Sequence, residues 1–128
     1  MTIASLVPVD PPINLRFIPS NRMPDDSGAL DYIAWDQPEN MDGIEGFLVY
    51  TQEGDEWAPN NSTFINSTDV LHVLALDEFY AYRSVTMTWR VKSIAKKGYR
   101  PDSDWVRGPN YTIGRAAMID RAKENNND

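Results

Sequence analysis

The sequence predicts an all-β protein with a single antiparallel β-sandwich of about seven strands. Three observations lead to this prediction. Short apolar runs rich in β-branched and aromatic residues recur along the chain, clusters of Gly, Pro, Asn and Asp separate them about every ten residues, and no helical pattern occurs before residue 114. With 128 residues, the chain is long enough for one domain that buries a core without disulfides.

The first half of the chain contains three predicted strands. The first covers residues 13–18, INLRFI, and the loop PSNRMPDDSG follows it. The second and third strands lie at about 29–36 and 45–52. Between them stands the polar segment DQPENMDG, whose Pro, Asn, Asp and Gly residues suit a turn.

The middle of the chain is harder to divide into strands. Residues 53–67 contain turn residues and one or two short strands, because Pro59 and the Asn pair after it do not suit a long central strand. The run DVLHVLALD at 69–77 is apolar enough for a strand or a short helix, and its Val content favours a strand. Residues 84–95 alternate between two faces, which predicts a half-buried strand.

The last predicted strand, residues 105–113, is interrupted by Gly108 and Pro109, a pair that belongs at a bulge or a sheet edge. The segment RAAMIDRAKE after Gly114 is rich in helix formers but has too few apolar positions for a core helix, so it predicts a short helix or one that depends on a partner. The predicted organisation is therefore an extended arm over 1–10, the sandwich over 11–113, and a helix and tail over 114–128.

The order of these motifs resembles a fibronectin type III domain. The segments PPINLRF, YIAWDQPENMDGIEGFLVY, LHVLAL and TWRVKSIAKKGYRPDS follow one another as in that family. The resemblance implies that Trp35 is the core tryptophan and that five further side chains point inward: Phe47, Val49, Trp89, Val91 and Ser93. The chain departs from the family at Met87, where a tyrosine is usual, and Tyr80 or Tyr82 could take that role.

Composition argues against several classes of function. The chain has no cysteine, which removes thiolate metal sites and disulfides, and its seven glycines form no phosphate-binding loop. A net charge of −7 argues against nucleic acid as a partner. The N-terminus lacks a basic region, and Pro8 and Asp10 interrupt its apolar stretch. We therefore expect neither export nor a membrane partner, and synthesis in the cytoplasm.

The charges are distributed unevenly. Residues 1–64 carry eleven acids and two bases (−9), whereas residues 65–128 carry eight acids and ten bases (+2). The oppositely charged strands can simply face each other, which is the interpretation we favour. The alternative is a basic binding patch, formed by Lys92, Lys96, Lys97 and Arg100.

The sequence offers little for catalysis, cofactors or metals. His72 is the only histidine, and its strand register predicts that it points to solvent. Asp102, Ser103 and Asp104 supply oxygen ligands but do not match a calcium loop. We therefore predict a protein that is not an enzyme, with no catalytic, cofactor or metal residues.

The remaining candidates are residues that could contact another protein. Predicted loops carry aromatic residues of the kind that anchor interfaces, and the apolar residues of both tails, Val9 included, show no pattern that would bury them on their own sheet. The candidate protein-contact residues are Ile3, Leu6, Val7, Trp57, Phe79, Tyr80, Tyr82, Met118 and Ile119.

Two functions remain open. Domains of the fibronectin type III family recur in bacteriophage virions, and the resemblance implies a structural or adhesion module that binds other subunits of an assembly, such as capsid or tail proteins. The alternative is a carbohydrate-binding accessory module that stacks surface glycans on Trp57, Trp105 and the nearby tyrosines.

Overall fold

The computed structural model describes residues 7–20, 31–53, 62–66, 71–74 and 84–125. These residues form eight strands and one helix: β1 (Ile13–Ile18), β2 (Asp31–Asp36), β3 (Ile44–Glu53), β4 (Thr63–Asn66), β5 (Leu71–Leu74), β6 (Val85–Ala95), β7 (Val106–Arg107), β8 (Tyr111–Ile113) and α1 (Arg115–Asn125). Each strand predicted from the sequence overlaps one of these, and the prediction of an all-β fold is confirmed.

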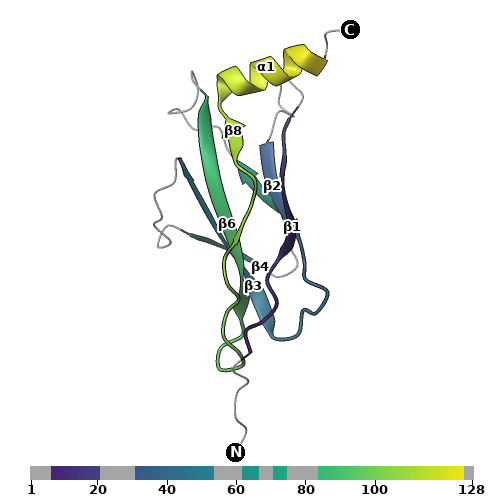
Figure 1. Cartoon of the computed structure of the whole chain (residues 1–128), viewed down its shortest axis with the longest axis vertical. Helices are drawn as coiled ribbons and strands as arrows, with labels where there is room; N and C mark the ends of the chain where they lie inside the picture. Colours follow the sequence, from purple (N-terminus) through teal and green to yellow (C-terminus); the bar gives the residue numbers. More distant parts are fainter. Residues whose placement is uncertain (1–6, 21–30, 54–61, 67–70, 75–83, 126–128) are drawn as a thin grey trace, which may run out of the picture.

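The strands form two antiparallel sheets (Figure 1). One has the order β1-β2-β5, and the other has the order β4-β3-β6-β7, with β8 also paired to β6. The two longest strands, β3 and β6, pair with Phe47 opposite Ser93 and Val49 opposite Val91. Helix α1 lies across the end of the molecule at which β8 ends and β2 begins, opposite the end at which β1 begins (Figure 1).

Both sheets contribute side chains to one apolar core. Its buried members come from β2, β3, β6 and β8: Ile33, Trp35, Phe47, Val49, Val85, Met87, Trp89, Val91, Tyr111 and Ile113. Trp35 and Trp89 are both 0% exposed, which confirms the prediction that they share a core. Alternation along the strands produces this core, because residues two apart point to the same side of a sheet.

The last predicted strand is two strands, and Trp89 explains the break. Its indole Nε1 donates a hydrogen bond to the Pro109 carbonyl over 2.7 Å. The ring lies so close to Gly108 that a Cβ there would come within 2.1 Å of the ring atom Cε2. Only glycine fits at this position. The chain stops pairing with β6 after β7 and pairs with it again at β8.

β1 contains an irregularity that the sequence did not reveal. Asn14 has a φ of 53°, and the pairing of β1 with β2 shifts register between Ile13 and Arg16. Asp36 holds this bulge, because it accepts hydrogen bonds from Asn14 Nδ2 (2.9 Å) and from Arg16 Nη1 (3.0 Å). A bulge of this kind interrupts the edge of a sheet.

Because of the bulge, we expect part of the stability of the fold to be lost in acid. The hydrogen bond from Asn14 and the neighbouring Arg16 hold the pKa of Asp36 below its ordinary value of 3.8. A lowered pKa means that the charged carboxylate stabilises the fold above that value, and that this contribution is lost as the pH falls through the folded-state pKa. We expect Asp36→Asn to destabilise the protein near neutral pH and to cost progressively less in acid. Urea unfolding of both proteins at several pH values measures this, and a cost that does not change with pH would contradict it.

Candidate functional site

The N-terminal arm segment, residues 7–12, is held by the turn between β6 and β7. Arg100 donates hydrogen bonds from Nε to the Val7 carbonyl (2.9 Å) and from Nη2 to the Pro8 carbonyl (2.6 Å). The Val9 amide donates to the Pro101 carbonyl over 3.0 Å. These three hydrogen bonds all involve main-chain atoms of the arm segment. They therefore fix its path and do not depend on the identity of its side chains.

One side chain of the arm segment is a buried anchor. Val9 is 1% exposed and packs with Ile44 and Ala95 in a small cluster, against which Met41 also lies. Burying a valine contributes about 1.5–3 kcal/mol. The expectation that no part of the arm could be buried on its own domain is therefore wrong for Val9. Hydrophobic periodicity could not predict this contact, because a single buried anchor has no period.

Tyr99 and Val7 are exposed at this same end of the molecule. The Tyr99 ring packs against Gly43, where a Cβ would lie only 2.4 Å from ring carbon Cδ1 and where φ is +80°. Its hydroxyl donates to Asp42 Oδ2 over 2.8 Å, and this bond to a carboxylate raises the pKa of Tyr99 above its ordinary value of 10.0. Tyr99 thereby connects the β6–β7 turn to the β2–β3 turn.

Two members of the alternative basic patch, Lys92 and Arg100, are paired within the chain. Lys92 pairs with Asp102 at 3.6 Å and lies over the Trp105 ring at 5.1 Å from its centroid. Arg100 is engaged by the arm segment, which leaves Lys96 and Lys97 exposed. This arrangement favours the interpretation in which opposite charges pair within the fold.

The motif Asp102-Ser103-Asp104, weighed above as a set of oxygen ligands, has a structural role. Asp102 Oδ1 accepts a hydrogen bond from the Ala95 amide, and Ser103 Oγ accepts one from the Ser93 amide, each over 2.8 Å. The Ser103 amide in turn donates to the Ser93 carbonyl over 3.0 Å. These side chains take the place of a neighbouring strand along the end of β6.

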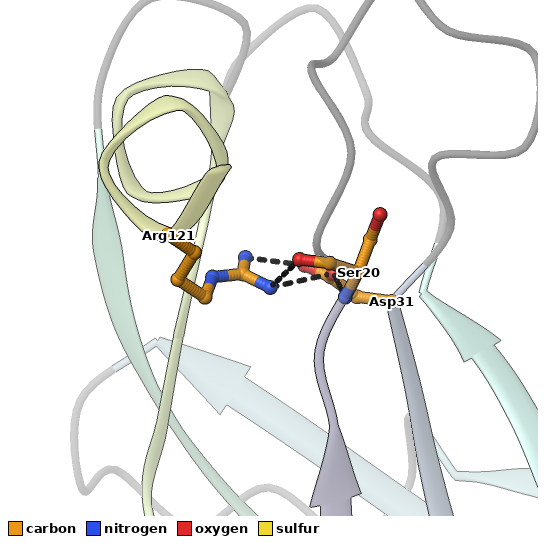
Figure 2. A network of polar contacts seen from close by, with 3 residues as sticks. All are labelled: Ser20, Asp31 and Arg121. Atoms are coloured by element: carbon orange, nitrogen blue, oxygen red, sulfur yellow. Dashed lines mark hydrogen bonds and ion pairs between the residues drawn. The ribbon is translucent and has the colours of Figure 1, made fainter. Parts of the chain in front are cut away.

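At the opposite end, one buried ion pair fastens α1 to the three-stranded sheet (Figure 2). Arg121 Nη1 and Nη2 donate to Asp31 Oδ1 and Oδ2, each over 2.9 Å, and Nη1 also donates to the Ser20 carbonyl over 3.1 Å. The Ser20 amide donates to Asp31 Oδ1 over 2.8 Å. The exposed fraction of the Asp31 side chain is 2%, so this carboxylate depends on these partners.

The same end contains a stack of planar side-chain groups and the apolar face of α1. The Arg121 guanidinium lies 5.6 Å from the centroid of the Phe17 ring, and that ring stacks on Tyr111 at a centroid distance of 4.9 Å. Met118 and Ala122 are each 1% exposed. Met118 was predicted as a contact to another protein; that prediction is wrong, because the chain itself buries it. Ile119 is half-buried.

Several large apolar side chains of the described residues remain exposed: Val7 (64%), Ile13 (49%), Ile18 (40%), Phe64 (50%) and Tyr99 (42%). Of these, only Val7 was predicted as a contact. Ile13 lies opposite Asp36, and Ile18 lies opposite Tyr32. Since the core residues of β2 are Ile33 and Trp35, both isoleucines belong to the other face of this sheet, the face turned away from the core.

The other predicted residues have no described position. Ile3, Leu6, Trp57, Phe79, Tyr80 and Tyr82 all lie outside the described residues. His72 belongs to β5, where its backbone pairs with Ile33, but its side chain also lies outside the described part. Within the described ranges, no group of three His, Asp or Glu side chains could hold a metal ion. The one described helix is neither long nor apolar enough to cross a membrane.

No model of a known protein family matches the chain, and a search of curated protein sequences returns no match.

Proposed function

We propose that this chain is a non-enzymatic structural module that binds other protein subunits in an assembly, as an accessory or decoration protein of a bacteriophage head or tail. The proposal includes a fibronectin type III-like sandwich. In support, β1, β2 and β5 share one sheet while β3, β6 and the last strands share the other. Immunoglobulin-like sandwiches divide their A, B and E strands from their C, F and G strands in the same way.

The observation that carries the proposal is the exposure of three apolar side chains along the arm segment and the edge strand β1: Val7, Ile13 and Ile18. β1 is at the edge of its sheet, and the arm segment leads directly into it. Exposed apolar residues that gather on one surface mark contact sites for other proteins. The bulge at Asn14 disrupts the strand edge, so we propose that the partner packs on these side chains rather than adding a strand to the sheet.

The described residues favour this function over carbohydrate binding. Sugar stacking requires an open aromatic face. One face of Tyr99 is covered by Gly43, and Lys92 lies over the ring of Trp105. Phe64 is exposed on β4, but its ring packs against Gly46, where a Cβ would lie 2.5 Å from ring carbon Cζ.

Single charges placed on this edge test the proposal. We expect Ile13→Glu and Ile18→Glu to abolish binding to the partner subunit, because each places a carboxylate in an apolar contact. Thr63→Glu is the matched control, since it puts the same charge at an exposed position of the edge strand β4. The wild-type chain and the three variants are immobilised, and a protein retained by the wild type is purified and titrated against each.

The proposal is supported if the purified protein forms a complex with the wild type and with Thr63→Glu but not with either isoleucine variant. If the purified protein binds all four chains equally, the exposed edge is not the contact and the proposal fails at this surface.

A further inference from the structure

We infer that the outer face of the five-stranded sheet binds a short, carboxylate-rich segment of another protein. The surface is formed by Arg90 and Lys92 of β6 and Arg107 of β7, and we call it the arginine face. It belongs to the sheet that does not contain β1, so it is separate from the contact along β1 that carries the proposed function. The inference therefore gives the module a second surface for a partner.

The strand register places the two arginines on one side of the sheet. Trp89 and Val91 are fully buried in the core, and Arg90 lies between them in β6. Successive side chains of a strand point to opposite faces, so the Arg90 side chain points away from the core. Arg90 pairs directly with Arg107, and directly opposite residues share a face. Two guanidinium groups therefore extend from adjacent strands on the outer face.

The positions that flank Arg90 on this face are not acidic. Its cross-strand neighbours are Arg107 on one side and Tyr50 on the other. The nearest positions of β6 on the same face are Thr88 and Lys92. Like charges at directly opposite positions repel each other and lower the stability of a sheet. The sheet thus keeps an unfavourable pair of cations at a place where an anionic group from outside would be attracted to both.

An apolar patch adjoins the arginine face. Leu48 of β3 pairs with Phe64 of β4 on one side and with Lys92 on the other, so these three side chains share the outer face. Phe64 is 50% exposed. The surface therefore suits a segment that presents carboxylates next to an apolar side chain.

The charge of the whole chain favours a short protein segment as the occupant. Guanidinium groups bind carboxylates through paired, charge-assisted hydrogen bonds. The net charge of −7 repels a long polyanion such as nucleic acid. A short acidic segment brings a few carboxylates to the arginines and keeps the rest of its chain away from the acidic surface.

Nuclear magnetic resonance with defined peptides tests the inference. The probes are a short peptide in which glutamates flank a leucine, the same peptide with glutamine in place of glutamate, and a short single-stranded oligonucleotide. Each is titrated into the isotope-labelled full chain. We expect only the acidic peptide to shift the amide signals of β6 and β7. Arg90→Gln/Arg107→Gln should weaken its binding about tenfold, the size expected from two partly exposed ion pairs.

Lys96→Gln/Lys97→Gln is the matched control, because it removes the same charge from exposed positions between β6 and β7. Its binding of the acidic peptide should stay close to that of the wild type. The inference is overturned if the two double variants lose affinity equally, if the glutamine peptide binds as well as the acidic one, or if the oligonucleotide alone binds.

Thermal unfolding gives a readout that does not depend on the signals of single residues. Arg107→Gln removes the like-charged pair, and the exposed hydrogen bond from Arg107 Nη2 to Asn110 Oδ1 (3.2 Å) adds little stability. We therefore expect the midpoint of the free variant not to fall, and the acidic peptide to raise the midpoint of the wild type more than that of the variant. A clear fall for the free variant would show that Arg107 serves the fold, which contradicts the inference. The proposed function is judged by Ile13→Glu and Ile18→Glu on the other sheet, so the two can fail separately.

Discussion

Replacing Arg121 with methionine is expected to lower the free energy of unfolding by about 3–5 kcal/mol. The substitution leaves the Asp31 carboxylate, 2% exposed, with a hydrogen bond from the Ser20 amide but no countercharge at the former position of the guanidinium. An uncompensated buried charge is costly, whereas the pair itself adds little net stability. The substitution of Arg121 also removes the guanidinium that lies over the Phe17 ring. Unfolding in guanidinium chloride, followed by circular dichroism, measures the change.

Two matched variants separate the buried charge from the loss of a side chain. Asp31→Asn/Arg121→Met removes both charges and keeps an oxygen for the Ser20 amide, so it should recover most of the lost stability. Arg16→Met makes the same change in the pair with Asp36, where both side chains are 40% and 47% exposed, and should cost much less. Equal costs for Arg121→Met and Arg16→Met would show that the burial of Asp31 does not matter.

The strands could be predicted from the sequence because their signals are local. Alternation in the segment that forms β6, and the turn residues on both sides of β3, appear within a window of ten residues or so. The contacts that attach the termini are not local. Arg121 and Asp31 are 90 residues apart in the chain, and Arg100 and Val7 are 93 apart. A pattern indicates which residues of a segment share a face, but it does not indicate which distant segment will meet that face.

The helix shows how this limit affects a prediction of function. The segment RAAMIDRAKE has a weak apolar stripe, and from that stripe we predicted a helix that needs another subunit. The structure supplies the missing contact from the same chain, as an ion pair to Asp31 with Met118 and Ala122 buried beneath the helix. Counting apolar residues could not reveal this attachment, because part of it is an ion pair to a residue 90 positions away in the chain. Val7, which was predicted as a contact to another protein, is 64% exposed in the structure, so that contact stays a prediction.

Replacing Trp35 with alanine is expected to cost about 3–5 kcal/mol, the range for truncation of a large buried aromatic side chain. Trp35 is fully buried in the core shared by both sheets, and its ring packs edge-on against Phe47 at a centroid distance of 5.7 Å. Alanine would leave a cavity between β2 and β3, strands that belong to different sheets and have no backbone hydrogen bonds to each other to limit the damage. Urea unfolding measures the cost.

Trp35→Phe is the informative control, because it separates the volume of the indole from its polar group. Among the described residues, the buried Nε1 of Trp35 has no hydrogen-bond acceptor. An unpaired buried donor is unfavourable by about 1–3 kcal/mol, so removing it offsets part of the volume that phenylalanine loses. We therefore expect Trp35→Phe to retain more than half of the stability that alanine removes. If phenylalanine costs as much as alanine does, the indole N–H makes a stabilising contact in the folded protein, and the core depends on that polar contact as well as on apolar packing.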